Sequence, residues 1–185
     1  MAKRILPLLI MLALTACATR HEQESEYNQG VAAYRTKDYV AARGHWAKAV
    51  EQKEVAALNN LGFLLYFGLG GPIEHAQAVS LWSEAAAKGH SEAQWHLGRA
   101  YEDGIGLSQS NVEAYAWYRC AIESSEAAST EDTTESAIAE DAHKSLTKLL
   151  SRLSAQEFSS SETLAKQYIA NYAKKSREAK PQNAE

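Results

Sequence analysis

Apolar and polar positions follow a helical period along most of the chain. Between residues 23 and 125, small and apolar residues recur three or four positions apart, in stretches separated by short turns. This spacing gathers apolar side chains on one face of an α-helix. Alanine is abundant and the 185 residues include only three prolines, which also favours helices. The pattern predicts an all-α protein.

The same pattern occurs twice at a fixed distance. The stretch Leu61–Pro72 (LGFLLYFGLGGP) returns thirty-six residues later as Leu97–Ser108 (LGRAYEDGIGLS). At this spacing seven Gly, Ala or Leu residues are identical and fall in one order, and Trp82 aligns with Tyr118. Self-similarity at a period of this size is typical of stacked helix pairs.

A third, shorter copy precedes these two. Trp46 stands thirty-six residues before Trp82, yet Gly30 stands only thirty-two residues before Gly62. The first unit therefore lacks four residues in the loop between its two helices. Helix pairs of this kind bury their apolar faces against neighbouring pairs, and about three units are the usual minimum for a stable stack. The chain has three.

The two glycine-bearing units resemble the Sel-one-like repeat, and the short first unit resembles a tetratricopeptide repeat. The second unit departs from the pattern, with Leu65 where a tyrosine usually stands and Leu81-Trp82 in place of Trp-Tyr. The resemblance implies a short right-handed α-solenoid of antiparallel helix pairs, with three repeats over residues 23–125. The third unit carries the full pattern, which is Leu97-Gly98, Tyr101, Gly104, Gly106, Ala114, Trp117-Tyr118 and Ala121.

Each residue of this pattern has a mechanical reason. We expect the first helix of the third unit near residues 91–101, with Gly98 inside it, where glycine costs about 1 kcal/mol relative to alanine. The cost is tolerable if the missing side chain lets the partner helix approach closely. Gly104 and Gly106 are expected to end the helix and to supply the positive φ angles of a tight loop. Asn111 is expected to cap the second helix.

The composition changes after the third repeat. The segment 126–136 belongs to an acidic, Ser- and Thr-rich stretch and is predicted to be an exposed loop. Two helices are expected over residues 137–175, and Ser154-Ala155-Gln156-Glu157 has the form of a capping box that opens the second. They resemble the terminal helices of Sel-one-like proteins, which cover the open apolar face of the last repeat. Residues 176–185 are polar and are predicted to be disordered.

The N-terminal end has the form of a lipoprotein signal peptide. Lys3 and Arg4 precede an apolar stretch well below the roughly 20 residues of a membrane span. The stretch closes with Leu14-Thr15-Ala16-Cys17, which resembles the lipobox of bacterial lipoproteins. The resemblance implies that residues 1–16 are removed and that Cys17 is lipidated. The alternative is an ordinary signal peptide with a chance cysteine.

Lipidation has consequences for location. The cysteine of this family carries more than one acyl chain, and two or more chains hold a protein stably on a bilayer. Ala18 follows Cys17, where an Asp would have resembled the inner-membrane retention signal of enteric bacteria. The resemblance therefore implies an outer-membrane lipoprotein of the cell envelope that faces the periplasm.

Charge and cysteine content narrow the function. Without Lys3 and Arg4, 17 basic and 23 acidic residues remain, a net charge of about −6 with His neutral. This balance disfavours nucleic acid and electrostatic attachment to anionic lipids. If Cys17 carries the lipid, Cys120 is the only other cysteine, so no intramolecular disulfide is possible. Cys120 is expected to be a buried thiol.

Catalytic and metal-ligating patterns are missing from the sequence. It has no Gly-rich phosphate loop, no His-Glu-x-x-His motif and no cysteine pair at ligand spacing. His90 and His96 fall on opposite faces of a helix, and Glu92 with His96 is expected to be a surface ion pair. We therefore expect no enzyme activity, no cofactor and no metal. A penicillin-binding hydrolase is the least favoured alternative, because the disulfide-rich pattern of those relatives is absent.

The concave surface of the predicted stack is the candidate binding site. In tetratricopeptide-like stacks, the first helix of each pair lines this surface, and exposed aromatic and Arg side chains are common interface anchors. We expect the groove to bind other envelope proteins through an extended peptide. The alternatives are a peptidoglycan ligand, or aromatic side chains that merely pack between units. The residues carried over are Tyr27, Tyr34, Asn59, Phe63, Phe67, Trp95, Arg99 and Glu102, with Glu24 and Val31 beside them in the first unit.

Overall fold

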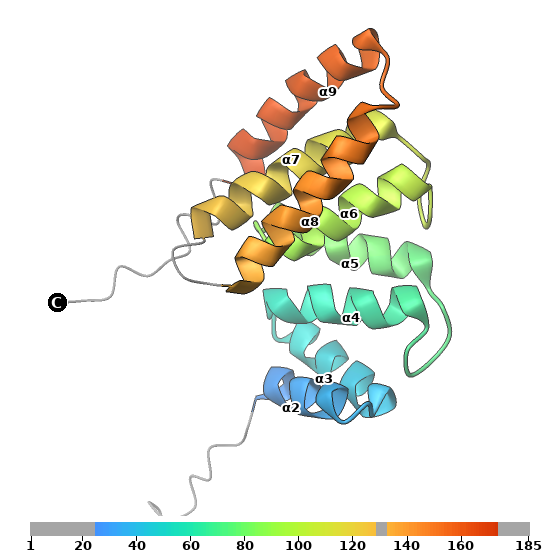
Figure 1. Cartoon of the computed structure of the whole chain (residues 1–185). Coiled ribbons are helices and arrows are strands. Elements are labelled where there is room, and N and C mark those ends of the chain that lie inside the picture. The colour runs from blue at the N-terminus through green and yellow to red at the C-terminus, as the bar shows by residue number, and fades with distance from the viewer. Residues whose placement is uncertain (1–24, 129–132, 174–185) are drawn as a thin grey trace, which may run out of the picture.

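The computed structural model describes residues 25–128 and 133–173 (Figure 1). All regular secondary structure in these residues is helical. The first six helices form three pairs that stack in chain order. No strand occurs in the described ranges, so the predicted all-α solenoid is confirmed. The pairs are α2 (Glu26–Arg35) with α3 (Tyr39–Glu51), α4 (Val55–Phe67) with α5 (His75–Ala87), and α6 (Ser91–Asp103) with α7 (Asn111–Ala128). They are followed by α8 (Thr133–Leu150), α9 (Ala155–Tyr168) and a π-helical turn η1 (Ile169–Ala173).

Within each pair, a glycine of the first helix lies against an aromatic side chain of the second. A Cβ atom added at Gly62 would lie 2.7 Å from Trp82 Nε1, and one at Gly98 would lie 2.7 Å from the Tyr118 ring. Side-chain atoms do not approach so closely, so only glycine lets the helices cross at this separation. The predicted role of Gly98 is confirmed. The three pairs are Gly30 with Trp46, Gly62 with Trp82, and Gly98 with Tyr118.

Hydrogen bonds tie the two tryptophans to the helices that they cross. Trp46 Nε1 donates to the Tyr27 carbonyl and Trp82 Nε1 donates to the Asn59 carbonyl, each at 3.2 Å. In both repeats the acceptor stands three residues before the crossing glycine. A buried indole N–H needs an acceptor, so this bond fixes how the second helix is rotated against the first.

The Gly-x-Gly loops seat each repeat on the one before it. Gly70 and Gly106 have φ angles of 75° and 80°, which other residues rarely adopt. A Cβ atom at Gly106 would also lie 2.7 Å from the His75 carbonyl oxygen, and one at Gly70 would collide with the Tyr39 carbonyl. Tyr39 and His75 begin the second helices of the preceding repeats. Gly104 caps α6 in the left-handed conformation, as predicted.

Two N-terminal helix caps were predicted from the sequence and can be compared with the structure. The prediction of Asn111 as a cap is wrong by one residue, because α7 already includes it and Ser110 Oγ accepts from the Glu113 N–H at 3.2 Å. The Ser154–Glu157 capping box is confirmed at the start of α9. In both caps a serine hydroxyl satisfies an N–H of the first turn that has no partner in the helix.

Most of the acidic segment after the repeats is helical. The predicted loop over residues 126–136 is wrong for all but residues 129–132, which lie outside the described residues, since α7 runs into the segment and α8 begins before its end. Ser91 Oγ donates to Glu135 Oε2 at 2.7 Å, which holds the first turn of α8 beside the start of α6. Composition did not reveal this long-range contact. The predicted tail over 176–185 also lies outside the described residues.

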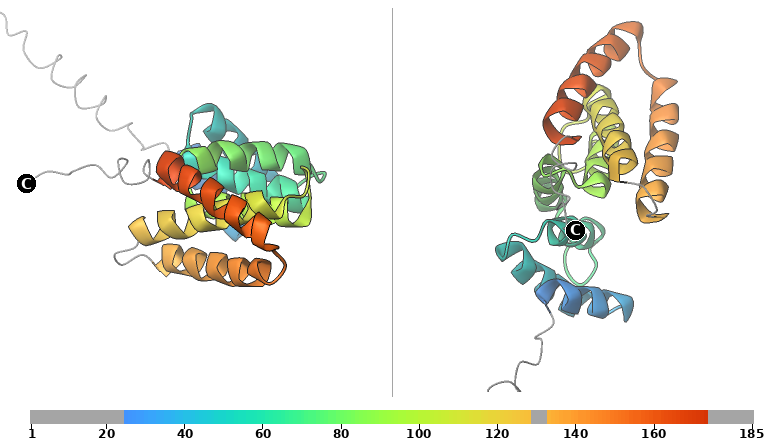
Figure 2. Two further views of the ribbon diagram at one scale, coloured as in Figure 1. Left: turned by 90° about the horizontal axis from the view of Figure 1, so that it is seen from above. Right: turned by 90° about the vertical axis from the view of Figure 1, so that its left-hand side faces the viewer.

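The last two helices flank α7. The right-hand view of Figure 2 places α7 between α8 and α9. α8 packs on both α6 and α7, α9 packs on α7, and η1 reaches back to α5. Ala142 and Leu149 of α8 and Ala165 of α9 are buried in these contacts. The two helices therefore cover the last repeat from two sides.

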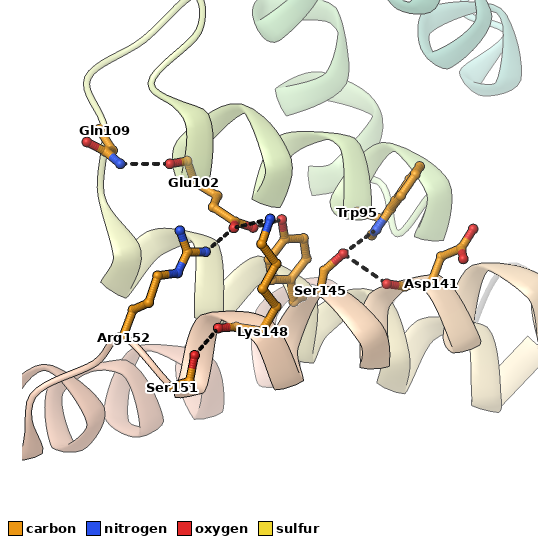
Figure 3. Close-up of polar contacts among 9 residues, drawn as sticks. Trp95, Glu102, Gln109, Asp141, Ser145, Lys148, Ser151 and Arg152 are labelled. Carbon is orange, nitrogen blue, oxygen red and sulfur yellow. Dashed lines mark hydrogen bonds and ion pairs between the residues drawn. The ribbon is translucent and has the colours of Figure 1, made fainter.

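A buried carboxylate joins α8 to the third repeat. The Glu102 side chain is 8% exposed and accepts hydrogen bonds from the Tyr118 hydroxyl, at 2.7 Å, and from the Arg152 guanidinium (Figure 3). Lys148 Nζ lies 3.9 Å from the same carboxylate. Burial, with the hydrogen bond to Glu102, raises the pKa of Tyr118 above its ordinary value. The Tyr118 hydroxyl therefore remains protonated and donates.

We expect Gly62→Ala to lower the free energy of unfolding by about 1–3 kcal/mol, because its methyl group would collide with Trp82. Gly44→Ala is the matched control, since Gly44 lies inside α3 with no atom within 4 Å of an added Cβ. That change should raise the free energy of unfolding by up to about 1 kcal/mol. Urea unfolding followed by circular dichroism measures both. Equal effects of the two changes would contradict the crossing.

Glu102→Ala should lower the free energy of unfolding by about 1–3 kcal/mol, because the Tyr118 hydroxyl loses its acceptor inside the core. Lys148→Ala should change it by less than about 1 kcal/mol, since that side chain is 75% exposed. Thermal unfolding in a calorimeter checks the pair. If Glu102→Ala were as stable as Lys148→Ala, the Glu102 carboxylate would not be an important contact between α6 and the α8 region.

Candidate functional site

The first two repeats, together with Glu92 at the start of the third, form a groove of about 530 Å³ on the face of their first helices. Four of the eight predicted site residues line it: Tyr27 and Tyr34 from α2, and Asn59 and Phe63 from α4. Val31, also expected there, lines it too. Glu24 lies outside the described residues. The remaining lining residues are Arg35, Trp46, Asn60 and Glu92.

The aromatic side chains of the groove both pack and face outward. The Tyr34 ring centroid lies 5.6 Å from that of Trp46 and 6.4 Å from that of Phe63. Phe63 in turn lies 4.7 Å from Phe67. Tyr34 and Phe63 are half-buried, so part of each ring faces the groove while the rest packs on the core. The walls are therefore preformed by core packing and need little reordering to receive a ligand.

Asn59 and Glu92 form the polar end of the groove. Asn59 Nδ2 donates to Glu92 Oε2 at 2.8 Å and joins α4 to α6. An ionised carboxylate only accepts hydrogen bonds, so the amide must turn Nδ2 toward it. Asn59 is 2% exposed, and its Oδ1 is buried without a donor among the described residues. An unpaired buried acceptor costs about 1–3 kcal/mol, and Glu92 holds the amide in this orientation despite that cost.

Glu92 also faces a buried histidine. His96 Nε2 lies 3.8 Å from Glu92 Oε1, and the His96 ring stacks on Trp82 with centroids 4.6 Å apart. The His96 side chain is 7% exposed and that of Glu92 is 40% exposed. The prediction of a surface ion pair is wrong for His96, because spacing along α6 could not show that α5 covers the ring. His96, together with Asn59, holds the pKa of Glu92 below its ordinary value against the opposing effect of burial, so this carboxylate is ionised at neutral pH.

The other four predicted residues lie outside this groove. Phe67, at the end of α4, is 48% exposed and packs on Phe63. On α6, Trp95 Nε1 donates to Ser145 Oγ of α8 at 3.3 Å (Figure 3). The Arg99 guanidinium lies 5.3 Å from the Trp95 ring centroid. Trp95, Arg99 and Glu102 line a separate cavity of about 300 Å³ against α8.

The groove is therefore shorter than predicted, because it does not continue along the first helix of the third repeat. α8 lies against the face of α6 that carries Trp95 and Glu102, which the repeat pattern could not indicate because α8 is not part of it. Sequence reasoning also missed Glu92 as a groove residue, treating it only as a partner of His96. A usable signal was its position in the first turn of α6, thirty-three residues after Asn59, where the next repeat meets the previous first helix.

Metal-holding groups, membrane-spanning helices and the cysteine thiol can each be assessed in the described residues. Within residues 25–128 and 133–173, no group of three or more His, Cys, Asp and Glu side chains is placed to hold a metal ion. No helix in this part of the chain has the length and apolar content needed to cross a bilayer. Cys120 is buried as expected, and burial raises the pKa of its thiol to about 12. A thiol in that state is a poor nucleophile.

Solved structures similar to this chain include the following two. One is c5321, a protective antigen of uropathogenic Escherichia coli that displays an SLR fold, with a TM-score of 0.69 and 29% identity over 86% of this chain. Another is a Sel1 repeat protein from Oxalobacter formigenes, with a TM-score of 0.51 and 37% identity over 55% of this chain. The matched regions make up 33% and 42% of those two proteins, so the chain spans less than half the length of each.

The sequence profile of the Sel1 repeat matches residues 25–54, 55–90 and 91–125. These three segments hold the helix pairs α2–α3, α4–α5 and α6–α7, each with its crossing glycine. They make up more than half of the chain, and their boundaries agree with the repeat period in the sequence. Proteins built from this repeat are in general scaffolds for protein–protein interaction. The chain belongs to the Sel1 repeat family.

Proposed function

We propose that this protein is a lipid-anchored adaptor of the cell envelope, facing the periplasm, that holds a segment of another protein in the groove of its first two repeats. The observation that carries the proposal is the groove itself, with half-buried aromatic walls and a polar end. Such a surface supplies apolar contact area and hydrogen bonds to an extended segment. A family whose members generally scaffold protein partners supports the same function.

The proposed anchor is Cys17 of the lipobox, with attachment at the outer membrane. Tyr27, the first groove residue, follows Cys17 by ten residues, a stretch that spans at most about 35 Å when fully extended. A partner bound in the groove would therefore be held close to the bilayer. The net negative charge of the chain fits a tether that works through lipid rather than through attraction to anionic headgroups.

Cys17→Ser should move the protein from the membrane fraction to the soluble fraction after cell lysis, because the thiol that receives the lipid is lost. Cys120→Ser is the matched control, since it also removes one thiol but from the buried core. Immunoblots of the separated fractions measure the distribution. Retention of the Cys17→Ser protein in membranes would contradict the anchor.

Crosslinked pull-down from intact membranes tests the groove. Asn60→Trp fills the groove from a lining position on its polar side and should reduce captured partner about tenfold or more. Ala47→Trp adds the same bulk at an exposed position of α3 outside the groove and should leave capture unchanged. Equal capture by both variants would place the partner elsewhere. If instead the protein sediments with peptidoglycan and Asn60→Trp abolishes this, the proposal of a protein adaptor would be wrong. The groove would then be a binding site for cell-wall glycan.

A further inference from the structure

Within residues 25–128 and 133–173, histidine is the only basic residue type that pairs with the carboxylate of Glu92. Its contacts are the Asn59 amide and the His96 ring, and no Lys or Arg of the described residues forms an ion pair with it. Four other glutamates with limited exposure have a Lys or Arg partner within the fold. Glu26 pairs with Lys48, Glu74 with Arg43, Glu102 with Arg152, and Glu162 with Arg119.

The charge of Glu92 is directed into an aromatic groove. Its side chain is 40% exposed and lines the same cavity as Tyr27, Tyr34 and Phe63. The faces of aromatic rings attract cations, and a long basic side chain packs its apolar stem on such rings while its head reaches a carboxylate. A wall of rings that ends in an ionised carboxylate therefore matches a Lys or Arg side chain.

The polar groups beside Glu92 strengthen this match. Asn59 Oδ1 is buried, so the acceptors at this end of the groove are the two Glu92 oxygens and Asn60 Oδ1, which has a long contact of 3.4 Å from Asn59 Nδ2. This end of the groove is thus rich in acceptors, whereas a Lys ammonium carries three donors and an Arg guanidinium five. Arg35 stands in the last turn of α2, while Asn59 and Glu92 stand in the first halves of α4 and α6. First helices run in the same direction in a stack of repeats, so the positive charge of Arg35 does not occupy the Glu92 end.

Resting on the proposed function, we propose that the groove selects segments of partner proteins that carry a Lys or Arg side chain, and that Glu92 is the residue that receives it. Asn59 acts as a positioning residue, because its amide holds the carboxylate toward the groove. The aromatic walls grip the stem of the basic side chain and the neighbouring backbone. The groove then recognises one basic residue in an extended segment that is otherwise apolar.

Selection from a random peptide library displayed on phage tests the assignment, using the full chain purified from membranes in detergent. Glu92→Gln keeps an oxygen that accepts from Asn59 Nδ2 but removes the charge. Glu84→Gln is the matched control, because it removes one negative charge from an exposed site on α5 outside the groove. We expect wild type and Glu84→Gln to enrich Lys or Arg at one position, and Glu92→Gln to lose this preference.

The best selected peptide then serves as a probe in fluorescence anisotropy. Replacing its basic residue with norleucine should weaken binding to wild type and to Glu84→Gln about tenfold, and should leave binding to Glu92→Gln unchanged. Loss of peptide binding in Asn60→Trp shows that the peptides bind in the groove. If such peptides show no preference for Lys or Arg, the proposed role of Glu92 is wrong, and the proposed adaptor function is unaffected. Peptides that bind equally to Asn60→Trp, or no enriched peptides at all, would overturn both.

Discussion

The close crossing of the two helices in each repeat is the constraint on which the rest of the structure depends. Because Gly62 has no side chain, the Trp82 ring reaches α4 and its indole N–H bonds to the Asn59 carbonyl. The ring then stacks on His96 of the next repeat, so one tryptophan joins a helix pair to its neighbour. A bulkier residue at the crossing would separate the helices and remove the support behind the groove.

The same packing decides where a ligand can bind. The crossing fixes the backbone of Asn59, whose side chain holds Glu92 of the following repeat, and Trp46 supports the Tyr34 ring from behind. The polar end and the aromatic walls of the groove are thus consequences of how consecutive repeats stack. At the third repeat, α8 covers the face of α6 that a ligand would need, because Trp95 is hydrogen-bonded to Ser145 of α8 and Glu102 to Arg152, just beyond its end.

Residues that act within one repeat could be predicted from the sequence, and residues that act between distant segments could not. The period predicted the helix pairs, the crossing at Gly98 and the loop glycines, since these depend on local spacing. Glu102 looked like a groove residue by the same spacing, yet it is buried and hydrogen-bonded to Arg152, fifty residues away. The helical ends of the acidic segment and the exposed carboxylate of Glu92 likewise depend on contacts across the fold, which no local pattern records.

Site-specific photocrosslinking in living cells tests the central claim most directly. A benzophenone amino acid at position 35 replaces an exposed side chain that lines the groove, and one at position 40 replaces Val40, which is 70% exposed on α3 outside it. Both sites tolerate substitution because neither side chain is buried. The account predicts a crosslinked protein partner from position 35 and none from position 40. A partner captured from position 40 alone would contradict it.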